Sequence, residues 1–240
     1  MNPLIIGNWK MQESDEEAVV LAAALRRELV DDDRLVVCPS FTAIAGVSEV
    51  LRGSSIAIGA QDCAPADRGA LTGEVSVEEL VNLGCSYVLV GHSERRHIFG
   101  ETDDVIVEKA RTAIAHGLTP VLCVGETAEE RNAGQRDEVL ERQLRAVLDA
   151  GVDIEKCIVA YEPVWAIGTG DEADARDVAE AVMSIGDIIG PDVSVLYGGS
   201  VDELNVASFI SDGHCGGVLV GGASQRLDSF VAVIEASQRV

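Results

Sequence analysis

This sequence has few lysines, few aromatic residues and no long hydrophobic run. Only three of its 18 cationic residues are lysines, at positions 10, 109 and 156. Phe, Trp and Tyr make up 4% of the chain, so Val, Ile, Leu and Ala must supply most of the core. No stretch approaches the roughly 20 apolar residues that a membrane-spanning helix needs. We therefore expect a globular chain with no membrane partner.

The six cysteines contain no close pair, and this spacing disfavours a disulfide scaffold or a zinc site. Several of them lie beside apolar runs, which predicts buried free thiols. The opening segment, MNPLIIGNWK, has no basic region before its short apolar run, so it is unlike a secretory signal. We expect a cytoplasmic protein.

Positive charge is also scarce. With 41 acidic and 18 basic residues, the formal net charge is −23. Nucleic-acid binding requires clustered Lys and Arg against the phosphate backbone, so this balance disfavours nucleic acid as a partner.

What the chain does contain is an alternation of short β-rich apolar runs with helical segments. Runs that are apolar on both faces are typical of parallel strands covered on both sides. Eight strand–helix units predict a single-domain (β/α)8 barrel with a parallel eight-stranded sheet, spanning residues 1–240. A doubly wound open sheet is the alternative, but no G-x-G-x-x-G motif follows the first run. The runs are LIIGN, LVVC, AIGAQ, YVLVG, TPVLCV, CIVAYE, SVLYG and GVLVG.

Three helix starts carry capping signals. Ser14 precedes Glu17 by three residues and Ser76 precedes Glu79 by three, which is the capping-box spacing. Asp174 stands before a third helical segment, ARDVAEAVMSIGDII, as a candidate N-cap.

Polar side chains follow several of the predicted strands. Asn8 and Lys10 follow the first, His92 the fourth and Glu162 the sixth. Each alone has an ordinary structural explanation, but a barrel brings the carboxyl ends of its strands to one mouth, where its chemistry lies. Glycine pairs in YGGS and VGGAS follow the seventh and eighth strands, where backbone N–H groups form a recurring phosphate cradle.

Six motifs, in order along nearly the whole chain, resemble the triosephosphate isomerase family. This resemblance implies a TIM barrel that interconverts dihydroxyacetone phosphate and glyceraldehyde 3-phosphate as a cofactor-independent aldose–ketose isomerase, without metal. The motifs are GNWKM (7–11), GALTGEVS (69–76), VGHSERR (90–96), AYEPVWAIGTG (160–170), YGGSV (197–201) and LVGGAS (219–224).

The resemblance also implies residue roles, and this acid–base scheme is familiar for the family rather than worked out from these residues. Glu162 would be the base, and His92 a neutral imidazole that polarises the carbonyl. Lys10 would supply positive charge, and Asn8 would orient the substrate. Ser93 would be a resting partner of Glu162, and Glu94 a partner of Lys10.

The segment PVWAIGTG is similar to the mobile lid of this family. By the same resemblance, Pro163 to Trp165 would form its first hinge. Phosphate would be bound by Asn8, Lys10 and the N–H groups of the glycine loops, and Tyr197 and Ser200 would latch the closed lid. The implied phosphate-binding residues of the loops are Gly168, Ser200, Gly221 and Gly222.

A homodimer through the 62–76 loop is implied as well, with Thr72 near the loop tip inserting beside Asn8 and Lys10 of a second copy. The chain departs from the family pattern at several positions. Leu71 stands where an aromatic residue is usual, Gln225 where an apolar one is, and 171–172 at the second lid hinge are both acidic.

Two other classes of function compete. One is a different phosphate-binding barrel enzyme, such as a sugar-phosphate epimerase or a barrel of the tryptophan pathway. An epimerase would need metal-ligating histidines, and the chain has four histidines in total. The other is a non-catalytic barrel that binds a sugar phosphate, which we would expect to have lost Lys10, His92 or Glu162.

Overall fold

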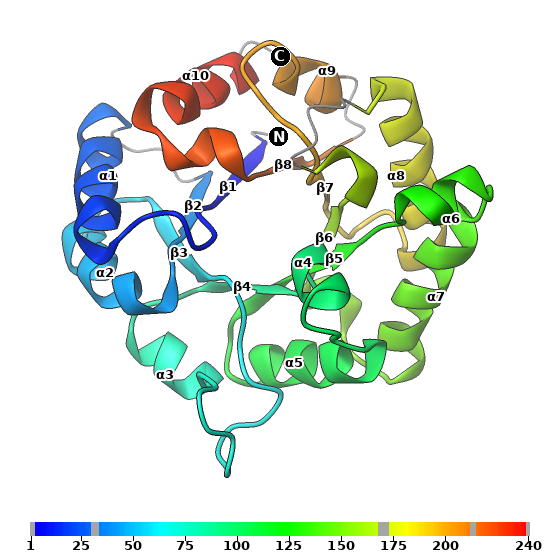
Figure 1. Cartoon of the computed structure of the whole chain (residues 1–240), viewed down its shortest axis with the longest axis horizontal. Coiled ribbons are helices and arrows are strands. Elements are labelled where there is room, and N and C mark those ends of the chain that lie inside the picture. Colours follow the sequence, from blue (N-terminus) through cyan, green and yellow to red (C-terminus); the bar gives the residue numbers. More distant parts are fainter. Residues whose placement is uncertain (1–2, 30–33, 168–172, 212–214, 239–240) are drawn as a thin grey trace.

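Eight parallel strands form a closed barrel in sequence order, and helices surround it (Figure 1). A computed structural model describes residues 3–29, 34–167, 173–211 and 215–238. The closed barrel confirms the predicted fold, and the open-sheet alternative is wrong. The strands are β1 (Leu4–Asn8), β2 (Leu35–Cys38), β3 (Ala57–Ala60), β4 (Tyr87–Val90), β5 (Thr119–Val124), β6 (Ile158–Tyr161), β7 (Val195–Tyr197) and β8 (Gly217–Val220).

The apolar side chains form two separate cores. Because side chains alternate across a strand, one set points into the barrel and the other toward the helices. The smaller core, inside the barrel, consists of Ile6, Val36, Cys38, Leu89, Val121, Cys123, Ala160, Leu196 and Leu219. The larger core lies between sheet and helices and includes Ile5 and Trp9.

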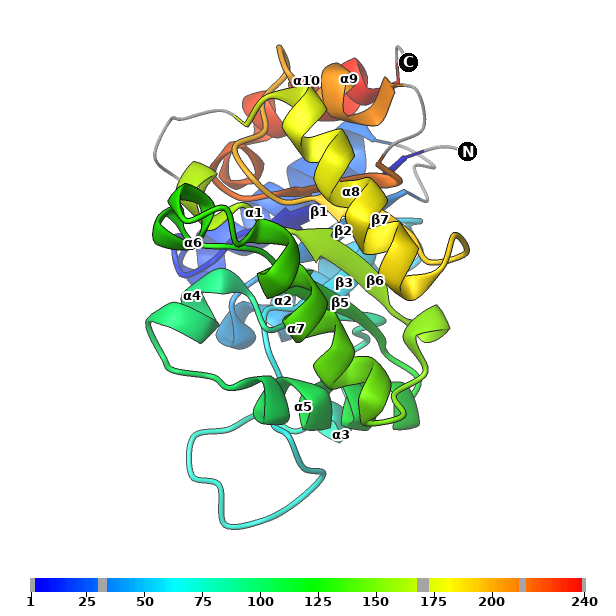
Figure 2. The same cartoon turned by 90° about the vertical axis from the view of Figure 1, so that its right-hand side faces the viewer.

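The helices cover the outside of the sheet, as the side view shows (Figure 2). They include α1 (Asp15–Glu28), α2 (Ile44–Leu51), α3 (Val77–Asn82), α4 (Ser93–His97), α5 (Asp103–Ala115), α6 (Ala128–Asn132), α7 (Arg136–Asp149), α8 (Ala175–Ile189), α9 (Val206–Ile210) and α10 (Leu227–Ser237). Short 3-10 turns are η1 (Phe41–Ala43), η2 (Ile154–Lys156), η3 (Val164–Ala166) and η5 (Gly222–Gln225).

The three predicted helix caps are confirmed. Ser14 and Ser76 each form a reciprocal capping box with the glutamate three residues later. Asp174 accepts a hydrogen bond from the N–H of Arg176. Each cap fixes where the chain leaves a loop and enters a helix.

Three further predictions can be compared with the structure. All six cysteines are free and buried, as expected. No helix in the described part of the chain is long and apolar enough to cross a membrane. Several predicted runs extend beyond the observed strands by a residue such as Glu162, because the backbone turns out of the sheet there to form the mouth of the barrel.

Candidate active site

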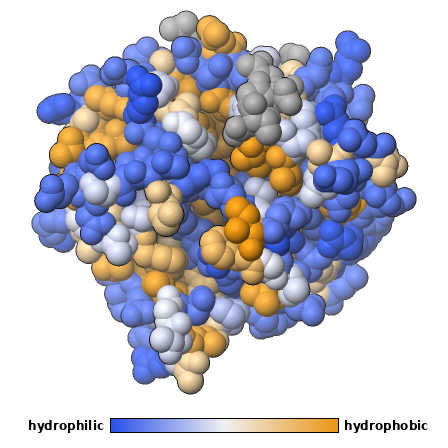
Figure 3. Space-filling view, viewed as in Figure 1, coloured by the Kyte–Doolittle hydropathy of each residue, from blue (hydrophilic) through white to orange (hydrophobic). Residues whose placement is uncertain are grey.

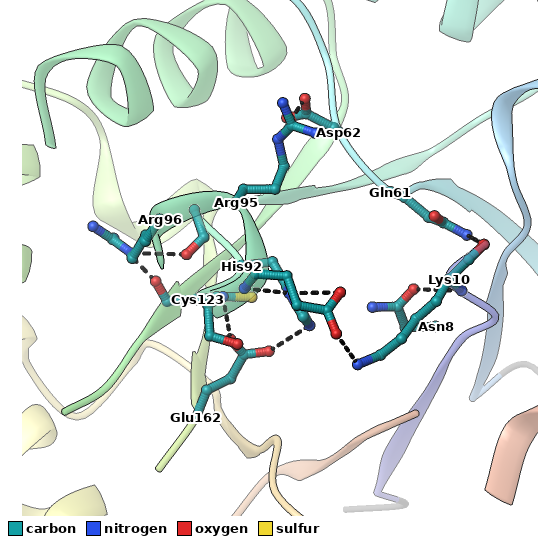
Figure 4. Close-up of polar contacts among 12 residues, drawn as sticks. Asn8, Lys10, Gln61, Asp62, His92, Arg95, Arg96, Cys123 and Glu162 are labelled. Carbon is teal, nitrogen blue, oxygen red and sulfur yellow. Dashed lines mark hydrogen bonds and ion pairs between the residues drawn. The ribbon is translucent and has the colours of Figure 1, made fainter. Parts of the chain in front are cut away.

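The four predicted catalytic residues meet at the carboxyl-terminal mouth of the barrel (Figure 4). Asn8 ends β1, His92 follows β4 and Glu162 follows β6, while Lys10 lies two residues beyond β1. They line one cavity of about 290 Å³, together with Ile167, Gly198, Gly199, Ser200, Val201, Asp202, Asn205, Leu219, Gly221, Gly222 and Ala223.

The Glu162 carboxylate lies between two donors. Its Oε2 accepts a hydrogen bond from the backbone N–H of Ser93 at 2.9 Å. Its Oε1 lies 3.2 Å from Nε2 of His92. Glu162 is 2% exposed, so a carboxylate here depends on these contacts in place of water. Ser93 therefore occupies the position expected of a partner of Glu162.

The hydrogen bonds of His92 assign its proton. Its Nδ1 accepts from the backbone N–H of Glu94 at 3.2 Å. A backbone amide can only donate, so Nδ1 carries no proton and the ring is a neutral imidazole protonated on Nε2. His92 is also the N-cap residue of α4. The Nε2–H group is thus directed at Glu162 and the cavity.

Lys10 is held in an unusual backbone conformation. It is the only non-glycine with positive φ, at 56°, among the residues that the structure describes. Such a conformation costs on the order of 1–3 kcal/mol and persists only where the surroundings hold it in place. Its Nζ pairs with Glu94 Oε1 at 2.5 Å, as the resemblance implied.

Three side-chain amides hold the backbone around Lys10. Asn8 Oδ1 accepts from Lys10 N at 3.0 Å, and Gln61 Nε2 donates to Lys10 O at 2.7 Å. Gln225 Nε2 donates to Trp9 O at 3.3 Å. No sequence pattern predicts these contacts of Gln61 and Gln225, although Gln225 is one of the departures from the family pattern.

The glycine loops after β7 and β8 form the opposite wall of the cavity from His92. Ser200, Gly221 and Gly222 all line it. Ser200 Oγ donates to Ala166 O at 2.6 Å, which links the loop after β7 to η3. Tyr197 is fully buried against Phe209 and does not line the cavity. Gly168 and the acidic pair at 171–172 lie outside the described residues.

A buried carboxylate that the sequence analysis missed supports the segment after β6. Glu126 is 1% exposed and accepts hydrogen bonds from the Tyr161 hydroxyl, at 3.1 Å to Oε2, and from Trp165 Nε1 at 2.8 Å. Burial, then the nearby negative Glu126, raises the pKa of Tyr161. The sequence signal that could have identified Glu126 is its position just after β5, at the mouth of the barrel. Arg131 stacks over the Trp165 ring, 3.6 Å from its centroid.

A second buried cluster joins the exit of β3 to α4 and α5. Asp62 contacts Lys109 at 2.7 Å and Arg95 at 2.8 Å, and Glu101 contacts the same two cations. Burial raises the pKa of Asp62, and Lys109 opposes that shift. Within the described residues, no group of three or more His, Cys, Asp or Glu side chains is arranged to bind a metal ion.

Comparisons with known proteins agree with one another. The family model described as triosephosphate isomerase matches residues 3–237. A triosephosphate isomerase of Roseiflexus castenholzii is 46% identical over 97% of this chain and 96% of its own length. The triosephosphate isomerase of Moorella thermoacetica is 46% identical over 98% of this chain and 99% of its own length. That of Symbiobacterium thermophilum is 43% identical over 98% of this chain and 96% of its own length.

Proposed function

The chain belongs to the triosephosphate isomerase family, and we propose that Glu162, His92, Lys10 and Asn8 carry out its reaction. The reaction interconverts dihydroxyacetone phosphate and D-glyceraldehyde 3-phosphate by proton transfer, without a cofactor. The observation that carries the assignment is the contact between a buried carboxylate and a neutral imidazole at the mouth of the barrel. A base and a proton donor are what an enediol pathway requires.

Glu162 removes a proton from the carbon beside the carbonyl and returns it to the neighbouring carbon. In the described state its Oε2 is bound to the N–H of Ser93. This is a resting position, and the carboxylate must leave Ser93 to reach a substrate carbon. The chain from Pro163 onward leads into the lid, so closure of the lid would also move the base.

His92 polarises the substrate carbonyl with its Nε2–H group and passes protons between the two oxygens. Lys10 stabilises the negative charge that develops on those oxygens, and Asn8 orients them. Fixed donors and charges of this kind act strongly where water is excluded. Glu94 holds the Lys10 ammonium through its 2.5 Å contact.

The phosphate group binds on the β7–β8 side, where Ser200, Gly221 and Gly222 line the cavity. Backbone N–H groups at glycines approach phosphate oxygens closely because no side chain intervenes. Gly168 of the lid is proposed to add a further N–H donor. Ser200 already contacts Ala166, directly after the first hinge, and Tyr197 is proposed to join it when the lid closes.

We also propose that the enzyme acts as a cytoplasmic homodimer. The 62–76 loop projects from the barrel (Figures 1 and 2), and Leu71 is 43% exposed. A cavity of about 200 Å³ that Asn8 and Lys10 help to line has apolar Met11, Phe41 and Phe99 among mostly polar residues, and it would receive this loop from a second copy. Thr72 would then lie against the partner's catalytic residues.

The test is a coupled assay of glyceraldehyde 3-phosphate isomerisation with Glu162→Ala and the exposed control Glu155→Ala purified from the same host. Loss of a positioned general base lowers turnover about 100- to 10,000-fold. We expect that loss in Glu162→Ala and wild-type turnover in Glu155→Ala. Equal trace rates in all three preparations would indicate contamination and favour a non-catalytic barrel.

A further inference from the structure

Arg96, on α4, joins the exits of two neighbouring strands. Its Nε donates to the carbonyl oxygen of Gly91 at 2.8 Å, and its Nη2 donates to that of Cys123 at 3.1 Å (Figure 4). Its Nη1 pairs with Asp103, at the start of α5, at 2.6 Å. The side chain is 8% exposed, so all three guanidinium nitrogens are used inside the protein.

These contacts continue the sheet where backbone pairing stops. The pairing of β4 with β5 ends at Val90 opposite Leu122. Gly91, the next residue, turns away with φ of 71°, so it does not pair with Cys123. Glycine also leaves room for the guanidinium, since a Cβ at this position would lie 3.0 Å from Arg96 Nη2. The guanidinium therefore bridges a gap that the turn creates.

The bridge joins the strand exits that carry the two groups proposed to move protons. His92 directly follows Gly91, on the β4 side. On the β5 side, the Val124 carbonyl accepts a hydrogen bond from the N–H of Glu162 at 2.7 Å. The backbone of His92 is thus connected to that of Glu162 through Arg96 and the end of β5. The two side chains, which stand at the two ends of this backbone connection, meet at 3.2 Å between Nε2 of His92 and Oε1 of Glu162.

We propose that Arg96 is a positioning residue for the isomerisation, which sets the separation of His92 and Glu162 without touching substrate. This inference rests on the proposed function. Only arginine suits the position, because a planar fork of donors reaches three acceptors at once and a lysine ammonium does not. Asp103 keeps the buried cation paired, and Arg142 holds Asp103 from α7 at 2.5 Å.

The first test is Arg96→Lys, which keeps the charge and most of the volume. A displacement of about 1 Å in a catalytic group costs about 100-fold in rate. We expect kcat to fall about 10- to 100-fold. KM and the inhibition constant of inorganic phosphate should stay within about 2-fold, because the proposed phosphate cradle is on the β7–β8 side.

Arg142→Lys is the matched control. Arg142 binds the same Asp103 but is 55% exposed and contacts neither strand exit in the contacts described. It should keep wild-type kcat, and both variants should be assayed well below their melting temperatures. Wild-type kcat in Arg96→Lys would overturn the proposal. So would equal losses in kcat and phosphate binding, since these indicate general disruption.

A second readout does not depend on turnover. Long-range ¹H–¹⁵N spectra report the imidazole of His92, whose Nδ1 accepts from Glu94 N. We expect the His92 signals to shift in Arg96→Lys and to stay in place in Arg142→Lys. Unchanged signals in Arg96→Lys would overturn the positioning role. Absence of turnover in the wild type would instead refute the proposed function, and the spectra would still test the bridge.

Discussion

The six buried thiols make stability sensitive to alkaline pH. Burial raises the pKa of Cys63, Cys85, Cys157 and Cys215 to about 12. An unfolded thiol titrates near pH 8.5. The folded state therefore keeps protons that the unfolded state loses, so this stability is complete below about pH 8.5 and is lost as the pH rises toward 12.

We expect the free energy of unfolding to fall between pH 8 and 10, on the order of 1 kcal/mol per thiol at pH 10. Urea unfolding across this range measures it. Cys85→Ala should show a shallower fall than the wild type, after allowance for its lower stability at pH 7. Parallel curves for the two proteins would contradict the thiol origin of the effect. A thiol-specific chromogenic reagent should react with none of the six in the folded protein at pH 7.5.

The catalytic candidates were predictable because they lie at the end of a strand or just after it. Parallel strands in a closed barrel bring their carboxyl ends together, so Asn8, His92 and Glu162 could be placed at one mouth from the sequence. The side chains that hold them were not. Gln61 reaches Lys10 from 51 positions away, and Gln225 reaches Trp9 from 216. Such contacts depend on side-chain reach between distant elements, which no local pattern specifies.

At the level of elements, the 62–76 loop is fixed at its base and projects at its tip. Ala64 N donates to Val75 O at 2.8 Å, and Asp67 pairs with His116 of the segment after α5 at 2.7 Å. The base is thus ordered before any second copy binds. The exposed tip carries Leu71, whose burial would supply apolar contact area to the proposed dimer.

Leu71→Asp should weaken the dimer, because a carboxylate would enter an apolar contact and lose its hydration. Sedimentation velocity on the wild type should give about twice the 25.3 kDa chain mass, and the variant should shift toward one chain mass. Leu204→Asp makes the same change at a leucine that is 86% exposed and outside this loop, and it should leave the mass unchanged. A wild type that sediments at one chain mass would refute the dimer.

The helix caps and the strands could be predicted because each has a local sequence signal. A capping box is a three-residue signal, and a strand covered on both faces is a short apolar run, so both are local in sequence. The cluster of Asp62, Arg95, Glu101 and Lys109 joins three elements and carries no such signal. Local sequence signals therefore account for the helices and strands, whereas the ion pairs that join them depend on how distant elements pack together.

At the scale of the whole molecule, a chain of net charge −23 acts on a phosphate dianion. Most of the surface in Figure 3 is hydrophilic, with separate apolar patches. Of the three lysines, Lys109 is buried and Lys10 lines the proposed site. Lys10 is thus a local positive charge at the proposed site, while the net negative charge of the chain repels a phosphate dianion at long range.

Salt separates these two effects, because it screens long-range repulsion first. The screening length falls from about 30 Å at 0.01 M to about 8 Å at 0.15 M. We expect kcat/KM for glyceraldehyde 3-phosphate to be depressed at the lowest ionic strength and to rise with modest salt. The uncharged substrate D-glyceraldehyde, which lacks the phosphate, should show no such rise. A steep fall from the lowest salt upward would mean that the local field of Lys10 and the strand-end loops dominates approach, and the net charge would then have no part in capture.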